Sequence, residues 1–309
     1  MNKKVVGILR GGTWENYDKS LFEGGKIISH VYENLSDKWK PVDVLIDKDG
    51  VWHLGGLPIK PADLMNKVNV VWNTVHPSCS VTLSSLAIPN VETNSFSKSI
   101  GSKEMLREHM KKIGIKMPRA FVIPAYQEDI DGEIEDFATK KAKEVFNKFS
   151  SPWIVRSLTE DLNAGIHLAK TFPELVNAIL DCVHHNKSIL VEEFIFGKTA
   201  SVHSVTGFRG ENFYNFPPVE HRDDVVVCPG KFSIEEKEKI IQAVKKIYSH
   251  TNTPHYLKSN FVVHPSRGIY FTHLEFFPDL DNDSDFHISC ESVGTKMHHV
   301  LEHILERAI

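Results

Sequence analysis

A predicted hairpin near the C-terminal end constrains the fold more than any other stretch of this sequence. Residues 259–263 (SNFVV) and 269–275 (IYFTHLE) are rich in β-branched and aromatic residues, and the intervening HPSRG is typical of a turn. If the turn has four residues, Asn260 lies opposite His273. Because side chains alternate along a strand, His273 and Glu275 share one face. We therefore expect Asn260, His273 and Glu275 to form a polar cluster, since directly opposed Cβ atoms lie roughly 5 Å apart.

This predicted cluster has two interpretations. A carboxylate, an imidazole and an amide oxygen on one sheet face can bind a divalent cation. Alternatively, the three side chains form a hydrogen-bonded cross-strand group beside the acidic loop at residues 279–285 (DLDNDSD). Short motifs often arise by chance, so the local sequence by itself favours the second interpretation.

The overall composition excludes several classes of protein. A chain of 309 residues is too long for one average core, which predicts two or three domains. The net charge of −4 gives no basic excess for binding nucleic acid, and no apolar run approaches the ~20 residues of a membrane span. The apolar run at residues 5–9 is too short for a signal peptide and is better explained as a buried strand. The four cysteines include no Cys-x-x-Cys pair, which favours a reducing cytoplasm over a disulfide framework.

Residues 1–95 alternate short apolar strands with helical stretches, a pattern typical of a parallel α/β sheet. We expect a strand over residues 4–9, a glycine-containing turn over 10–13 and a helix over 19–34. Glycines directly after the first strand allow a ligand close to the backbone at the carboxyl edge of the sheet. A plain turn explains them equally well.

Two further units are expected, over residues 96–186 and 187–309. The second unit begins with a predicted helix over 102–113 that a glycine ends. In the third unit, Ser233 and Glu236 predict a capping box for a helix that ends near residue 249.

The order of these landmarks resembles the ATP-grasp superfamily and, within it, the D-alanine–D-alanine ligases. The resemblance extends over nearly the whole chain. It rests on the ordered segments VGILRGG (6–12) with Ser20-Leu21, Ser102-Lys103, GIKMP (114–118), WIVR (153–156), ILVEEFIFG (189–197), PPVE (217–220), and the hairpin followed by Pro278 and Ser284. It implies an α/β chain, α+β in its ATP-grasp part, with a three-domain ATP-grasp architecture and a Rossmann-like N-terminal domain.

The resemblance also implies an activity. Such ligases use ATP to phosphorylate one D-alanine carboxylate, and the amine of a second D-alanine then attacks the acyl phosphate. The implied cofactors are ATP and a divalent cation (Mg or Mn), the implied substrate is an amino acid, and the implied role is cytoplasmic peptidoglycan synthesis for the cell wall. Family members are commonly homodimers.

The resemblance assigns roles by position to three groups of residues. Those expected to bind ATP are Lys103 and Arg156, at the phosphates, and Glu192 and Glu193, at the adenine. Those expected to act on the substrates are Lys258 (oxyanion), Ser284 (second carboxylate), and Glu15 and Ser20 (first substrate). Those expected to bind the metal are Asn260, His273 and Glu275. Each residue also has a structural explanation as a helix cap, a loop hydroxyl, an exposed first-turn residue, a strand-end cation or an edge-strand side chain.

Several positions depart from the family pattern. The metal positions hold amide, imidazole and acid where the family has acid, acid and amide, so binding of hard Mg²⁺ should weaken relative to Mn²⁺ or Zn²⁺. Arg156 replaces a lysine, Asn16 replaces an acid next to Glu15, and Asp161 brings a carboxylate into the phosphate loop. Only 12 residues separate Glu220 from Ser233, too few for the lid that excludes water from the acyl phosphate.

Three functions remain open. The chain is an active ligase, or a catalytically inactive ligase homologue (a pseudoenzyme) that acts as a binding or partner protein, or a small-molecule binding module that uses no ATP. The phosphate loop, the lid, the metal positions and the N-terminal acid are altered together. This combination slightly favours an inactive homologue.

Overall fold

The computed structural model describes residues 3–13, 17–91, 103–158, 165–184, 188–222 and 225–309. The chain forms two compact units. The first unit comprises residues 1–99, 199–260 and 273–309, and the second comprises residues 100–198 and 261–272. The division into three domains at residues 95 and 186 stays a prediction.

The N-terminal part of the first unit is built on a six-stranded sheet in the order β4-β3-β2-β1-β5-β6. Its strands are β1 (Lys4–Gly11), β2 (Trp39–Ile46), β3 (Trp52–Leu54), β4 (Leu57–Ile59), β5 (Val70–Asn73) and β6 (Asn90–Val91). β1 pairs in parallel with β2 and β5, and β5 with β6, whereas β3 and β4 extend the sheet in antiparallel fashion. The predicted parallel sheet is confirmed at its centre, and β4 is an additional strand.

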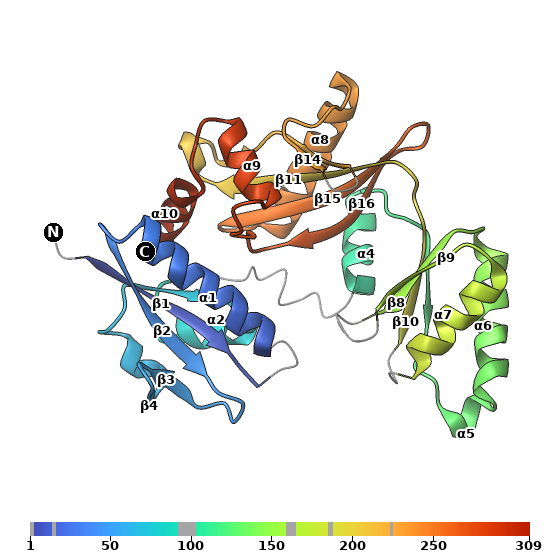
Figure 1. Ribbon diagram of the computed structural model, residues 1–309, viewed down its shortest axis with the longest axis horizontal. Helices are drawn as coiled ribbons and strands as arrows, with labels where there is room; N and C mark the ends of the chain where they lie inside the picture. The colour runs from blue at the N-terminus through green and yellow to red at the C-terminus, as the bar shows by residue number, and fades with distance from the viewer. Residues whose placement is uncertain (1–2, 14–16, 92–102, 159–164, 185–187, 223–224) are drawn as a thin grey trace. The chain divides into compact units, whose positions relative to one another are not determined.

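Helices cover this sheet because its central strands are apolar on both faces. α1 (Tyr17–Asn34) packs on β1 and β2 (Figure 1). Val6 and Ile8 of β1 join one core with Ile27 of α1, while Leu9 faces a second core with Val44. The remaining helical segments here are η1 (Pro61–Leu64) and α2 (Pro77–Ser85).

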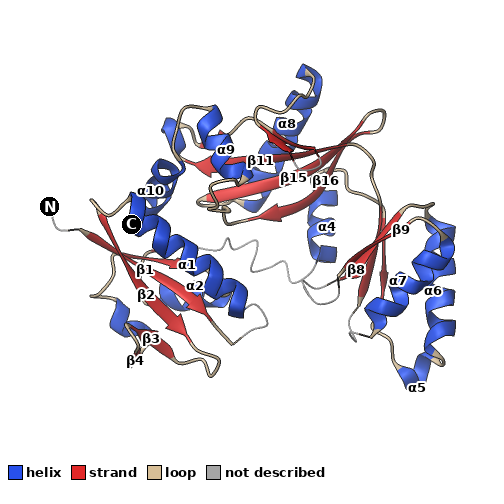
Figure 2. Cartoon of the chain, viewed as in Figure 1, coloured by secondary structure: helices blue, strands red, loops and turns tan. Residues whose placement is uncertain are grey.

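The second unit contains a four-stranded antiparallel sheet in the order β7-β10-β8-β9. The strands are β7 (Ala120–Ile123), β8 (Trp153–Ser157), β9 (Ile166–Ala169) and β10 (Ile189–Glu193). The helices are α4 (Lys103–Lys112), α5 (Glu128–Asp131), α6 (Ile134–Lys148) and α7 (Phe172–Val183), and α6 and α7 lie on one side of the sheet (Figure 2). Gly114, with φ +70°, follows the predicted helix at α4, although Ser102 lies outside the described residues.

The C-terminal sheet has the order β14-β13-β11-β15-β16, with β12 paired to β11. Its strands are β11 (Lys198–Thr206), β12 (Phe213–Asn215), β13 (Val219–Arg222), β14 (Val225–Val227), β15 (Tyr256–His264) and β16 (Gly268–Glu275). The predicted hairpin is therefore confirmed as β15 and β16. The associated helices are η3 (Phe208–Gly210), α8 (Ile234–Thr251), α9 (Asp285–Ser292) and α10 (Met297–Arg307).

Local capping signals explain where two of these helices begin. The Ser233 hydroxyl accepts the Glu236 N–H at 3.1 Å, and the Glu236 carboxylate accepts the Ser233 N–H at 2.7 Å. This is the capping box predicted from the sequence. Thr171 caps α7 with its side-chain oxygen, which accepts the Glu174 N–H. None of the helices in the described ranges is both long enough and apolar enough to cross a bilayer.

Candidate functional site

The predicted polar cluster on the hairpin is present and is centred on Glu275. Asn260 Nδ2 donates a hydrogen bond to Glu275 Oε1 at 3.0 Å, and His273 Nε2 lies 3.2 Å from the same oxygen. Burial by itself would raise the pKa of Glu275, but the contacts with His273 and Lys258 outweigh it and lower the pKa to about 2. Glu275 is therefore an anion at neutral pH.

Lys258 connects this cluster to a second carboxylate. Its Nζ lies 3.3 Å from Glu275 Oε1 and 3.0 Å from Asp285 Oδ2. Burial would lower the pKa of Lys258, but the two carboxylates outweigh it and raise the pKa, so the side chain remains an ammonium. A cation is thus retained at the position that the resemblance gives to the oxyanion group.

Asp285, the first residue of α9, is held by side chains from two other strands. Ser201 Oγ of β11 donates to Asp285 Oδ2 at 3.0 Å. His203 Nε2 lies 3.4 Å from Oδ1, and His221 Nε2 lies 3.5 Å from Oδ2. Burial would raise the pKa of Asp285, but its contacts with His203 and Lys258 outweigh it and hold the pKa below its usual range. Full burial lowers the pKa of His203, so this imidazole is neutral and Lys258 is the charged partner.

The hydroxyls of Ser284 and Ser20 are buried and bonded to the backbone. Ser284 is the N-cap of α9, accepting the His287 N–H at 3.2 Å and donating to the Asp279 carbonyl at 3.0 Å. Ser20 lies inside α1 and accepts the Gly11 N–H at 3.0 Å, so it does not cap that helix. Both hydroxyls position loops at this site, and a role toward substrate stays a prediction. Glu15, Asn16 and Asp161 lie outside the described residues.

Glu192 is buried and paired with two arginines. Its Oε1 accepts from Arg107 Nη1 at 2.9 Å, and its Oε2 contacts Arg156. Lys103, which the resemblance places at the phosphates, lies one turn before Arg107 on α4. The pairing of Arg107 with Glu192 was not predicted, and its spacing of four from Lys103 is the signal in the sequence.

Glu193 is also buried, and it is paired with two other arginines. Arg119 Nε donates to its Oε2 at 2.9 Å, and Arg267 Nη1 donates to its Oε1 at 2.6 Å. Burial would raise the pKa of Glu193, but the hydrogen bonds from Arg119 and Arg267 lower it to about 2. The alternative of an edge strand with one wet face is wrong, because β10 is an inner strand and both glutamates are buried.

The donors that the resemblance assigns to a divalent cation, an amide, an imidazole and a carboxylate, lie together at Glu275. Within the described part of the chain, the contacts of Glu275 with Asn260, Lys258 and His273 all involve Oε1. No group of three or more histidine, cysteine or acidic side chains is arranged for metal binding among the described residues. A cation would therefore need the Asn260 amide oxygen beside His273 and Glu275, a mixed set that suits Mn²⁺ better than Mg²⁺.

Comparison with protein families identifies the chain. The family model described as the D-Ala–D-Ala ligase C-terminus matches residues 110–306. This chain belongs to the D-alanine–D-alanine ligase family. A relative in this family, the D-alanine–D-alanine ligase of Fervidobacterium nodosum, is 22% identical over an alignment of 332 positions that covers 98% of this chain and 98% of the relative.

Solved structures of this ligase family share the fold. D-alanyl-alanine synthetase A from Vibrio cholerae superposes with a TM-score of 0.79 at 16% identity and covers 100% of this chain and 99% of its own. A D-alanine–D-alanine ligase from Bacillus anthracis, complexed with ATP, gives a TM-score of 0.73 at 17% identity, with coverage of 99% and 96%. The predicted α/β class and ATP-grasp fold are confirmed.

The segment between Glu220 and Ser233, which the resemblance predicts to be too short for a lid, is described except for residues 223 and 224. Between Glu220 and Ser233 the described residues form the short antiparallel pair of β13 and β14, followed by a bend at residues 228–229 and an irregular stretch. Glu220 is buried and accepts from Arg222 Nε at 2.7 Å and from the Lys231 N–H at 2.7 Å. Through these bonds Glu220 connects β13 with the stretch before α8.

Proposed function

We propose that this chain is an ATP-dependent carboxylate–amine ligase of the D-alanine–D-alanine type. The observation that best supports this is the Lys258 ammonium, held between Glu275 and Asp285 at the oxyanion position. ATP would transfer its terminal phosphoryl group to one amino-acid carboxylate. The amine of a second amino acid would then attack the acyl phosphate, forming an amide and releasing phosphate. Such a reaction would serve cytoplasmic peptidoglycan synthesis.

Each group of site residues has a part in this reaction. The Lys258 ammonium would stabilise the negative oxygen of the tetrahedral intermediate. Ser284, Ser20 and Glu15 would border the amino-acid substrates. Asn260, His273 and Glu275 would hold the divalent cation, which when bound neutralises charge on phosphate oxygens.

Lys103, Arg156, Glu192 and Glu193 would bind ATP. Arg156 Nε is buried and has no hydrogen-bond partner among the described residues. Because an unpaired buried donor is costly, a phosphate oxygen that accepts from Arg156 would remove that cost. This donor supports an anion site beside β8.

The decisive assay measures phosphate release from ATP in the presence of D-alanine and Mg²⁺ or Mn²⁺. We expect release only when both substrates are present, and a loss of about a hundredfold or more in Lys258→Met. Lys239→Met, on the exposed side of α8, should retain full activity. No release with any amino acid or metal would contradict the proposal.

A second candidate is a catalytically inactive ligase homologue that no longer binds ATP and acts as a binding or partner protein. The pairing of Arg156 with Glu192 favours it, because the guanidinium expected at the phosphates already has a buried carboxylate partner. Calorimetric titration with ATP and either metal separates the candidates. Binding of ATP supports the first candidate, and it also raises the melting temperature by mass action. If millimolar ATP gives no heat of binding and no shift in melting temperature, the inactive homologue is the remaining candidate.

A further inference from the structure

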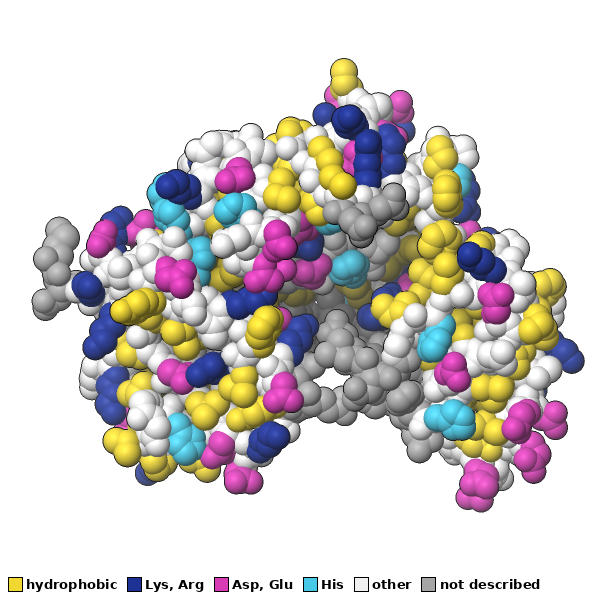
Figure 3. Space-filling view, viewed as in Figure 1, with side chains coloured by type: hydrophobic (Ala, Val, Ile, Leu, Met, Phe, Trp, Pro, Cys, Tyr) yellow, Lys and Arg dark blue, Asp and Glu magenta, His cyan; other side chains and the backbone are white. Residues whose placement is uncertain are grey.

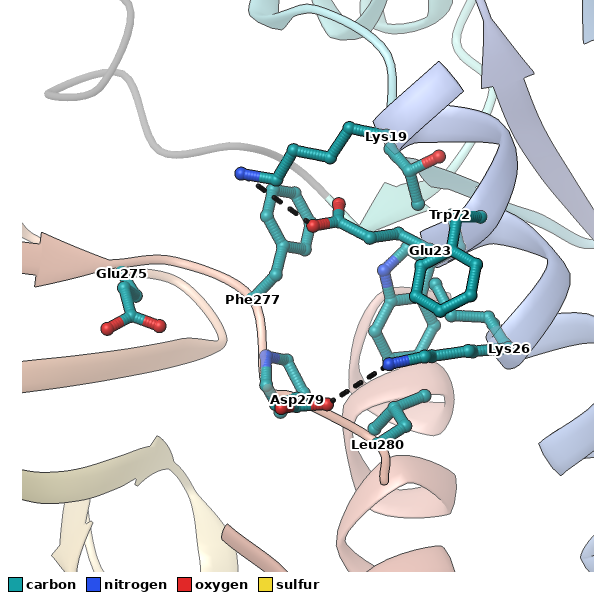
Figure 4. A pocket seen from close by; sticks show the side chains of 12 residues that line it. Lys19, Glu23, Lys26, Trp72, Glu275, Phe277, Asp279 and Leu280 are labelled. Carbon is teal, nitrogen blue, oxygen red and sulfur yellow. Dashed lines mark ion pairs between the residues drawn. The ribbon is translucent and has the colours of Figure 1, made fainter. Parts of the chain in front are cut away.

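A cavity of about 350 Å³ lies within the first unit, formed by α1, the end of β5 and the loop after β16 (Figure 4). Its volume is within the range of about 300–1,000 Å³ that is usual for small-molecule sites. The apolar side chains that line it are Phe22, Ile27, Trp72, Phe277, Pro278 and Leu280.

The position of the cavity in the sheet is one where α/β proteins bind ligands. The chain leaves β1 for β2 on one side, while β5 pairs with the other side of β1. The strand order therefore reverses between β1 and β5, and ligands bind outside the carboxyl ends of strands at such a point. Trp72 of β5 and Thr74, just after β5, both line the cavity.

Trp72 provides a second, independent observation. Its side chain is 1% exposed, and its indole Nε1 has no hydrogen-bond partner among the described residues. An unpaired buried N–H is unfavourable. An oxygen of a ligand in the cavity would supply the missing acceptor.

Charges of both signs line the cavity or lie beside it. Lys19 Nζ lies 3.9 Å from Glu23, and Lys26 Nζ lies 3.6 Å from Asp279 and 2.6 Å from Asp281. Figure 4 shows the first two pairs at the cavity, and Figure 3 shows basic and acidic side chains beside one another over this part of the first unit. Pairs that are exposed on at least one side contribute little to stability, so a charged ligand could replace either partner.

We propose that this cavity binds a free amino acid with a large apolar side chain, such as phenylalanine. The apolar wall would cover the side chain, carboxylates such as Glu23 and Asp279 would face its ammonium, and Lys19 and Lys26 would face its carboxylate. A methyl side chain would leave most of the apolar wall unused. Binding of this amino acid does not depend on the ligase activity. That the bound amino acid is a substrate rests on the proposed function.

The test is calorimetric titration of the full chain, without nucleotide or metal, with D- and L-phenylalanine and D- and L-alanine. We expect one phenylalanine enantiomer to bind about tenfold or more tightly than either alanine. Phe22→Ala should abolish this preference. Tyr32→Ala is the matched control, because Tyr32 is an aromatic residue on the same helix that is similarly exposed, 70% against 65% for Phe22. Equal affinities, or a preference unchanged in Phe22→Ala, would overturn the proposal.

Trp72→Phe tests the unpaired donor, since it keeps an aromatic ring and removes the N–H. We expect weaker binding of both amino acids with the preference retained, and unaltered binding would contradict the role of Nε1. Failure of the cavity proposal is distinguishable from failure of the ligase proposal. Phosphate release with D-alanine in a protein that does not bind phenylalanine would reject the cavity proposal alone. Phenylalanine binding without any phosphate release would reject the ligase proposal alone.

Discussion

Lys258 Nζ lies 3.0 Å from Asp285 Oδ2, which joins β15 to the first turn of α9 by an ion pair whose side chains are 14% and 7% exposed. Removing one member of such a pair leaves a charge with incomplete compensation in a poorly hydrated place. Since Glu275 contacts the same ammonium, the pair also sets the charge of the candidate active site.

Replacing Asp285 by asparagine should therefore destabilise the protein. We expect Asp285→Asn to lower the free energy of unfolding by about 3 kcal/mol at pH 7, because Lys258 loses one of its two carboxylates. Urea denaturation measures the change. Glu291→Gln, on the same helix with a side chain that is 68% exposed, should stay within about 0.5 kcal/mol of the wild type. Equal stability of the two variants would show that the pair contributes nothing.

Acid should destabilise the fold through its paired glutamates. The pKa values of Glu193 and Glu275 are lowered from 4.5 to about 2. A carboxyl group with a lowered folded-state pKa stabilises the fold above its unfolded-state pKa, and this contribution disappears as the pH falls toward the folded-state value. Urea denaturation should thus show stability falling between about pH 4.5 and pH 2. The stability of Glu193→Gln should fall less steeply with decreasing pH. The same pH dependence in the variant and the wild type would refute this account.

The proposed metal site can be tested without measuring turnover. Calorimetry should show Mn²⁺ binding more tightly than Mg²⁺, because the ligand set includes one carboxylate and one imidazole. Glu275→Gln should weaken Mn²⁺ binding by about tenfold or more, since it removes the only formal charge of the set. His53→Asn serves as the control, because His53 pairs with Asp47 at 2.8 Å in another histidine–carboxylate contact. If both variants bind Mn²⁺ like the wild type, the cation is bound elsewhere.

The capping box of α8 makes a prediction about stability alone. Ser233→Ala removes the acceptor of the Glu236 N–H and should cost about 1 kcal/mol in unfolding free energy. Ser249→Ala lies in the same helix at an exposed position and should be neutral or slightly stabilising. Chemical denaturation of the two variants side by side provides the comparison. A Ser233→Ala protein as stable as Ser249→Ala would mean that the cap is dispensable.

Features set by neighbouring residues could be predicted from the sequence. The hairpin followed from β-branched and aromatic runs on both sides of a turn, and the Ser233–Glu236 box from a spacing of three residues. β4 was missed because a proline stands at the centre of its three residues. Helix α9 was missed because its sequence continues an acidic run that is typical of a solvated loop.

Partners that are distant in the sequence could not be predicted. Nothing near Asp285 indicates that Ser201 and Lys258 from two other strands would surround it. The two adjacent glutamates of β10 likewise gave no sign that each would be buried with two arginines. The sequence located the candidate site, and the fold supplied the counter-charges that fix its ionisation.

Residues 261–272 form the tip of the β15–β16 hairpin and belong to the second unit, although the chain on either side of them belongs to the first. The Phe271 N–H donates to the Lys116 carbonyl at 2.8 Å, and Lys116 Nζ donates to the Arg267 carbonyl at 2.9 Å. A gene fragment encoding residues 100–198 would therefore lack part of its own unit. Producing that unit alone requires the hairpin tip to be joined to it through a new linker. A truncation to one continuous stretch of sequence would yield an incomplete unit.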